Sequence, residues 1–106
     1  MERAKQADIV FNALSKGNES YDPNPIYVDE NYFVTWLNTD SILHTVTSGT
    51  GIEDDTKGTG FDSPLLRPGE VYSHKFQTAG RYAYFCFLHP SMTGTVVVGN
   101  IESEET

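Results

Sequence analysis

Short apolar stretches alternate with polar turn segments along this 106-residue sequence. The stretches are rich in β-branched and aromatic residues, which is typical of strands, and none has the length or period of a helix. Strands are expected at residues 9–11, 26–28, 32–37, 44–47, 71–76, 81–87 and 95–98. The intervening segments, above all 15–25 and 48–70, are rich in turn-forming residues and are expected to be loops. The pattern therefore predicts an all-β protein, an antiparallel β-sandwich of seven to eight strands with no substantial helix.

Alternation within the sixth of these stretches distributes its side chains over the two faces of the expected sheet. If Cys86 points into the core, Tyr84 and Tyr82 share its face, whereas Phe85 and Phe87 point to the other face. Tyr82 also stands at the start of a strand, where the tyrosine corner of a Greek-key sandwich is found. An ordinary core aromatic is the alternative for Tyr82, and either role is compatible with the sandwich.

Acidic residues outnumber basic ones by 15 to 7, which gives the chain a formal net charge of −8. Such a surface repels phosphate backbones, so nucleic acid is excluded as an expected partner. The length fits a single domain over residues 1–106, with an acidic and flexible tail at about 100–106. No run of 18 apolar residues occurs, so no membrane span is expected in this chain. The sequence leaves open whether a signal peptide or an anchor was removed from a longer precursor.

The single cysteine, two of the three histidines and one methionine form a candidate metal site. Cys86, His89 and Met92 are spaced three residues apart, and on a tight loop this spacing can bring the three side chains to one point. His44, on an earlier strand, offers a second imidazole. Two imidazoles and a thiolate with a weak axial thioether describe a type 1 copper site. There are two alternatives. One is a zinc site, in which the methionine would have no role because zinc favours cysteine, histidine and carboxylate ligands. The other is no metal at all, with Cys86 as an ordinary core residue. His74 is expected to be a surface residue.

At these residues, and over nearly the whole chain, the sequence resembles cupredoxins of the plastocyanin, amicyanin and halocyanin type, including the plastocyanin-like proteins of archaea. The resemblance is carried by residues 21–23, 34–36, 44–47, 61–63 and 66–70, by Asp40, by Gly80 before Tyr82 and by the short ligand loop 86–92. It implies a Greek-key sandwich that holds one copper ion just under one end and cycles it between Cu(I) and Cu(II). The expected function is electron transfer rather than catalysis, with redox proteins as transient partners. The expected location is extracytoplasmic, in the periplasm or at the outer face of the cell membrane.

The resemblance also gives roles to residues around the copper ligands. The backbone N–H of Thr45 is expected to donate a hydrogen bond to the sulfur of Cys86. Leu88 stands where plastocyanin and amicyanin have proline, so its own N–H could donate a second bond to the same sulfur. Hydrogen bonds to a thiolate withdraw charge from it, so we expect a reduction potential above that of a proline-containing counterpart.

An electron-transfer patch is expected around the exposed edge of His89. Its members are Phe85, Phe87, Leu88, Pro90 and Ser91. A small and mainly apolar contact suits brief docking of a redox partner, because small interfaces dissociate quickly. Phe85 would face outward and supply a second, lateral path for the electron; a surface aromatic without a role is its alternative.

The axial ligand leaves two further functions open. Ser91 stands where a bulkier residue is often found, so Met92 could bind weakly or swing away from the metal. An open axial position would admit water or a small ligand such as nitric oxide, which would make the protein a small redox enzyme. The third hypothesis is a copper-binding or storage module without a kinetic role.

Overall fold

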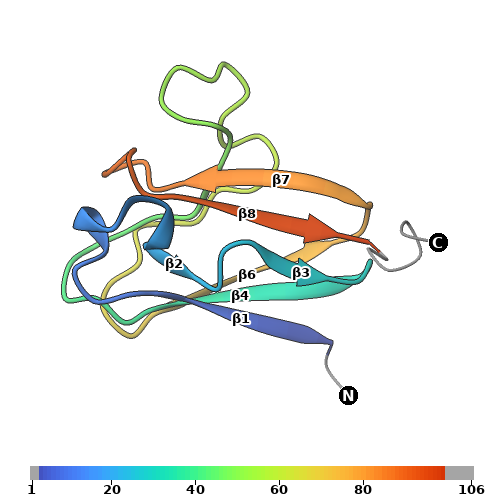
Figure 1. Ribbon diagram of the computed structural model, residues 1–106, viewed down its shortest axis with the longest axis horizontal. Helices are drawn as coiled ribbons and strands as arrows, with labels where there is room; N and C mark the ends of the chain where they lie inside the picture. The colour runs from blue at the N-terminus through green and yellow to red at the C-terminus, as the bar shows by residue number, and fades with distance from the viewer. Residues whose placement is uncertain (1–2, 100–106) are drawn as a thin grey trace.

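The computed structural model describes residues 3–99, which form two four-stranded β-sheets packed as a sandwich (Figure 1). The strands are β1 (Ala4–Ile9), β2 (Tyr21–Asp22), β3 (Ile26–Val28), β4 (Tyr32–Asn38), β5 (Thr47–Ser48), β6 (Val71–Phe76), β7 (Gly80–Phe85) and β8 (Thr93–Val98). One sheet has the order β2-β1-β4-β6 and the other the order β3-β8-β7-β5. Within residues 3–99 the helical structure is limited to two 3-10 turns, η1 (Ala13–Ser15) and η2 (Gly17–Glu19), which confirms the predicted all-β class. The acidic tail expected at 100–106 lies outside the described residues.

Two strand pairings are parallel, which corrects the expectation of an antiparallel sandwich throughout. β1 pairs with β4 in parallel, and β3 pairs with β8 in parallel, whereas the other pairings are antiparallel. The chain passes from β2 in the first sheet to β3 in the second before it returns as β4. β2 runs antiparallel to β1, and after the crossing β4 runs alongside β1 in the same sense.

The core forms between the two sheets, and β4 contributes its centre. Alternate residues of β4 are buried, namely Val34, Trp36 and Asn38, as a strand with one covered face requires. The ring of Trp36 is fully buried and packs edge-on against Tyr84 of β7, with the ring centroids 5.3 Å apart. The two sheets are therefore joined by an aromatic contact directly behind the end of β7, where Cys86 follows.

The residues at 3–9 and 44–47 differ from the sequence-based expectation. β1 begins at Ala4, well before the predicted start, although the side chains of residues 4–6 are exposed. Its strand conformation comes from backbone pairing with β4, which a hydrophobic pattern cannot reveal. His44 makes only an isolated bridge to Leu66, so regular strand structure resumes later, at Thr47.

The predicted tyrosine corner is present at the start of β7. The hydroxyl of Tyr82 donates to the backbone carbonyl of Thr78 at 2.5 Å. This contact is that of a tyrosine corner, in which the hydroxyl bonds to backbone a few residues upstream. No helix within residues 3–99 has the length and apolar character needed to cross a membrane.

Candidate metal centre

Cys86 opens a tight loop that carries three of the four predicted ligands. The amide of His89 donates to the Cys86 carbonyl at 3.1 Å, and the amide of Met92 donates to the His89 carbonyl at 2.9 Å. The amide of Cys86 in turn donates to the Met92 carbonyl at 3.1 Å. These bonds fold residues 86–92 into a compact loop between β7 and β8. Residues spaced three apart in the sequence therefore lie close together in the loop.

The fourth predicted ligand, His44, is held by the loop that follows β4. The side-chain amide of Asn38, at the end of that strand, donates to the carbonyls of Ile42 and Leu66, both at 2.9 Å. His44 and Leu66 also exchange two backbone hydrogen bonds, of 3.2 and 2.8 Å. The backbone of His44 is thus fixed by hydrogen bonds through both its amide and its carbonyl, and its side chain is fully buried.

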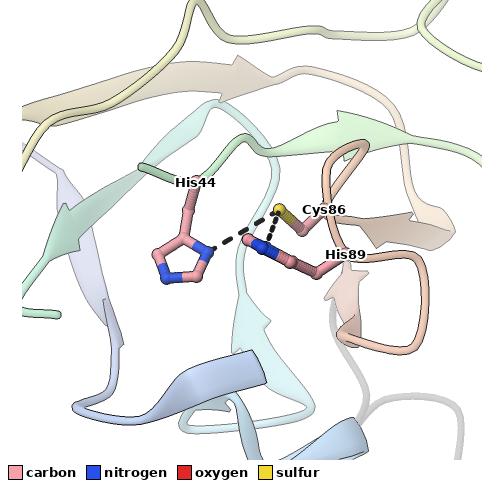
Figure 2. A group of neighbouring side chains, drawn as sticks. All are labelled: His44, Cys86 and His89. Atoms are coloured by element: carbon pink, nitrogen blue, oxygen red, sulfur yellow. Dashed lines mark hydrogen bonds between the residues drawn. The ribbon is translucent and has the colours of Figure 1, made fainter. Parts of the chain in front are cut away.

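The donor atoms of His44, Cys86 and His89 converge on one point. The Nδ1 atoms of the two histidines lie 3.7 and 3.6 Å from the sulfur of Cys86, and both rings turn their Nδ1 edge towards it (Figure 2). All three donor atoms lie within 4.8 Å of one another. A metal about 2.0 Å from nitrogen and about 2.3 Å from sulfur, at a trigonal angle, would separate these donors by about 3.7 Å. The arrangement therefore fits a bound transition-metal ion.

Met92 is fully buried and belongs to the same core cluster as Cys86. Its neighbour Ser91 is exposed, so the loop turns the thioether inward and the hydroxyl outward. A thiolate, two imidazoles and a nearby buried thioether form a soft, mixed donor set that suits copper, whereas zinc gains nothing from the thioether. The residues present thus fit copper better than zinc.

The charges of the metal-free site already favour a thiolate. Burial raises the pKa of Cys86. Hydrogen bonds from His44, from the Thr45 amide and from His89 together lower the pKa by more than burial raises it, and the result is a pKa of about 6. For His44, burial lowers the pKa, while the Cys86 sulfur and Asp40 raise it, and the result lies above the ordinary value. Since metals bind the thiolate rather than the thiol, the site is electrostatically prepared for a cation.

Thr45 takes the position expected for it beside the sulfur. Its amide donates to the sulfur of Cys86 at 3.4 Å, which confirms the predicted hydrogen bond. Its hydroxyl also accepts a hydrogen bond from the amide of Phe87 at 2.8 Å. Thr45 therefore connects the segment that carries His44 with the loop that carries the other ligands.

The second predicted donor, Leu88, is not confirmed. Over residues 3–99, the Leu88 amide makes no hydrogen bond to the sulfur of Cys86. The next amide of the loop, that of His89, donates to the Cys86 carbonyl at 3.1 Å and also helps to lower the pKa of the Cys86 thiol. The expected rise in reduction potential from Leu88 therefore loses its structural basis.

Phe85 was predicted as an exposed member of the electron-transfer patch, and this is wrong. Its side chain is fully buried, although it lies outside the core cluster that contains Tyr84 and Cys86. Alternation along β7 thus directs Phe85 to the other face of its sheet, as expected, but that face is covered at this point. Strand periodicity indicates the direction of a side chain and says nothing of what the rest of the chain places over it.

The other four patch residues are exposed. Phe87 and Leu88 have exposed fractions of 50% and 44%, and Pro90 and Ser91 are exposed as well. His89 is partly buried among them. The loops next to His44 carry further exposed apolar side chains that the sequence reasoning did not include, namely Ile42, Leu43 and Leu65.

His74 lies away from the ligand cluster, as expected, but it is half-buried rather than a surface residue. Its ring packs against Phe61 and Phe76, at centroid distances of 5.0 and 4.8 Å. This burial lowers the pKa of His74. The residue therefore belongs to the aromatic packing at the side of the core.

Asp40 is a buried residue of the site that the sequence reasoning did not assign to it. Its carboxylate lies 2.7 Å from Nε2 of His44, on the opposite side of the ring from the metal-facing nitrogen. Burial raises the pKa of Asp40, but hydrogen bonds from His44 and from three backbone amides lower it to about 2. The signal available in the sequence was an acidic residue four positions before a predicted ligand.

Comparison with known proteins agrees with this geometry. Residues 9–99 match the family of copper-binding proteins described as the plastocyanin/azurin family. Amicyanin-alpha of Methylorubrum extorquens is 46% identical over 67 residues, which cover 61% of this chain and 52% of that protein. Plastocyanin of Scenedesmus fuscus is 32% identical over 87 residues, covering 74% of this chain and 85% of that protein. The chain thus spans about half the length of the amicyanin-alpha relative.

A solved structure with a similar fold is that of a novel purple cupredoxin from Nitrosopumilus maritimus. The two structures superpose with a TM-score of 0.76 at 30% sequence identity. The match covers 89% of this chain and 98% of the purple cupredoxin. The sandwich and its sequence pattern are therefore shared over nearly the full length of both chains.

Proposed function

This chain belongs to the plastocyanin/azurin family of copper-binding proteins, and we propose that it carries single electrons on one type 1 copper ion bound by His44, Cys86, His89 and Met92. The observation that carries the proposal is the convergence of two Nδ1 atoms on one buried sulfur, at 3.7 and 3.6 Å. A copper ion held there supplies a one-electron couple between Cu(I) and Cu(II).

The protein's own contribution is a rigid set of donors. His44 is fixed by backbone bonds to Leu66, Cys86 receives the Thr45 amide, and the ligand loop is closed by its turn bonds. Few atoms need to move when the charge of the site changes, because these hydrogen bonds hold the donors in place from within the protein. A preorganised site of this kind favours fast electron exchange.

The proposed docking surface is the patch around His89, which comprises Phe87, Leu88, Pro90 and Ser91. Its apolar residues suit short-lived contacts with redox proteins, whose small interfaces release quickly. The net charge of −8 favours a partner with a basic surface. An extracytoplasmic location is part of the same proposal and rests on the resemblance to amicyanin and plastocyanin.

The first test of the ligand set is the visible and electron paramagnetic resonance spectrum of the copper-loaded protein. We expect an intense thiolate-to-copper band and a small copper hyperfine splitting, both lost in His89→Ala. The matched control is His74→Ala, which removes a histidine outside the cluster and should keep both signals. Persistence of the band in His89→Ala would refute this ligand assignment.

A second test concerns the docking surface and uses electron self-exchange between two copies of the protein. Leu88→Glu places a charge on the patch and should slow self-exchange at least tenfold without changing the spectrum, because like charges then meet at the contact. The control is Val71→Glu, at a residue 57% exposed on β6. Equal slowing in both variants would count against the patch.

The same measurements separate the two other functions. A spectrum that changes when nitric oxide is added would favour the open axial position and a redox enzyme. Tight copper binding with slow self-exchange in the native protein would favour storage. We expect neither result, because Met92 is fully buried beside Cys86 and the ligand loop is closed.

A further inference from the structure

Asp40 lies behind His44 as seen from the proposed copper position. Its side chain is almost completely buried, and its Oδ2 atom is 2.7 Å from Nε2 of His44. The other ring nitrogen of His44 faces the sulfur of Cys86 (Figure 2). One imidazole thus connects a buried carboxylate with the ligand cluster.

Within residues 3–99, every other hydrogen bond of this carboxylate comes from a backbone amide. Oδ1 accepts the amides of Asn12 and Ser41, at 3.0 and 2.8 Å. Oδ2 accepts the amide of Ala13 at 3.2 Å in addition to its contact with His44. An ionised carboxylate has only acceptor sites, so Nε2 of His44 must carry a proton in order to donate. In the neutral ring, whose single proton is then on Nε2, the Nδ1 atom keeps its lone pair free for a metal.

We propose that Asp40 is a positioning residue that holds His44 in the Nε2–H tautomer and stabilises the oxidised form of the bound copper. The inference rests on the proposed function, because it assumes copper at Nδ1 of His44. A carboxylate behind a metal-bound imidazole fixes its orientation and makes it a stronger donor. The added negative charge favours the ion of higher charge, so Asp40 lowers the reduction potential.

Asp40 also ties the metal centre to a surface turn. The amides of Asn12 and Ala13 belong to the turn at η1, which carries Leu14 and follows Phe11, and these two side chains are 48% and 62% exposed. The carboxylate therefore bonds at once to this apolar turn and to a proposed ligand.

Asp40→Asn is the informative variant because it keeps the shape and removes the acceptor character. The new NH2 group can take the position of either carboxylate oxygen. In place of Oδ1 it faces the amides of Asn12 and Ser41. In place of Oδ2 it faces the Ala13 amide and the His44 ring. At the second position it can donate to Nε2 of His44, which moves the ring proton to Nδ1. That proton competes directly with the metal.

The matched control is Asp54→Asn. Asp54 is likewise a carboxylate that accepts bonds from amides and hydroxyls, those of Thr50 and Thr56. It lies in the loop between β5 and β6 and touches none of the proposed ligands. Both variants change the net charge by the same amount, so a general effect of charge will appear in both.

The experiment combines nitrogen NMR of the copper-free protein with voltammetry of the copper-loaded protein. The native protein should show the proton of neutral His44 on Nε2, and Asp40→Asn should show a population with the proton on Nδ1. The Cu(II)/Cu(I) equilibrium should shift at least tenfold towards Cu(I) in Asp40→Asn, which for one electron is a rise of about 59 mV. Asp54→Asn should change neither quantity.

An unchanged potential and tautomer in Asp40→Asn would overturn the inference. A neutral His44 ring with its proton on Nδ1 rather than on Nε2 in the native copper-free protein would also overturn it, and this result does not depend on whether the variant folds. Failure of the proposed function looks different: the native protein would then lack the type 1 copper spectrum, whatever residue stands at position 40.

Discussion

Gly94 of β8 faces Tyr84 across the sheet, and replacing it with alanine should destabilise the protein through one specific clash. The two residues are register partners in the β7–β8 pairing. An added Cβ at Gly94 would lie 2.6 Å from the Tyr84 hydroxyl oxygen and 2.8 Å from its Cε2 atom, and closer still to Cζ. Favourable carbon contacts begin at about 3.5 Å, so the ring would have to retreat by about 1 Å.

The ring of Tyr84 cannot move away from Gly94 without displacing other core residues. It is 1% exposed and packs edge-on against Trp36 and Tyr21, at centroid distances of 5.3 and 4.7 Å. Overpacking of a core costs about 1–3 kcal/mol, and so rigid a site belongs near the upper limit. Alanine also lowers the conformational entropy of the unfolded chain, and this effect stabilises the folded protein by about 0.4–1 kcal/mol. The net loss for Gly94→Ala should be about 2 kcal/mol, or about 10 °C in Tm.

Urea unfolding of the copper-free protein, followed by the fluorescence of Trp36, measures this loss. Trp36 is the single tryptophan of the chain and is fully buried, so its emission reports the core. Gly60→Ala is the matched control, because its added Cβ would meet only Ser48, with the nearest atom at 3.2 Å. The control should change the free energy of unfolding by less than about 1 kcal/mol.

Equal unfolding midpoints for native protein and Gly94→Ala would refute the reasoning. A double-mutant cycle locates the cause. Tyr84→Leu is itself destabilising, but it removes the ring, so Gly94→Ala made in that background should cost little. A coupling below about 0.5 kcal/mol would show that the loss does not come from the contact with Tyr84.

Two further predictions concern hydrogen bonds and charge. Tyr82→Phe removes the 2.5 Å bond to the Thr78 carbonyl and should lower the free energy of unfolding by about 1 kcal/mol, measured in urea. Tyr72→Phe, which loses only a 3.3 Å bond from the Asp62 amide, should cost less, and the reverse order would contradict the corner's role. In the copper-free protein, hydrogen bonding to the thiolate outweighs burial and lowers the pKa of Cys86 from 9.0 to about 6. Its contribution to stability is therefore present above pH 9 and lost as the pH falls through about 6. The ultraviolet absorbance of the thiolate should titrate near pH 6, and a midpoint near 9 would be incompatible with the site described.

The sequence by itself determined the kind of protein and most of its metal chemistry. The β-branched and aromatic run at 32–37 corresponds to β4, and the alternating run at 71–76 corresponds to β6 without any shift. Local periodicity is enough here, because these strands bury one face and expose the other. The spacing of Cys86, His89 and Met92 was equally informative, because a loop this short keeps the three side chains close to one another.

Only the tertiary structure decided which groups meet across the chain. β1 is a strand because β4 pairs with its backbone, and Phe85 is buried because its face of the sheet is covered. The amide of Leu88 makes no hydrogen bond to the sulfur of Cys86 within residues 3–99, because its direction depends on how the ligand loop turns. Asp40 entered the site in the same way, through a contact that depends on how its loop folds over His44. Periodicity and ligand type are local properties of a sequence, whereas pairing, covering and hydrogen-bond partners arise between residues that the fold alone brings together.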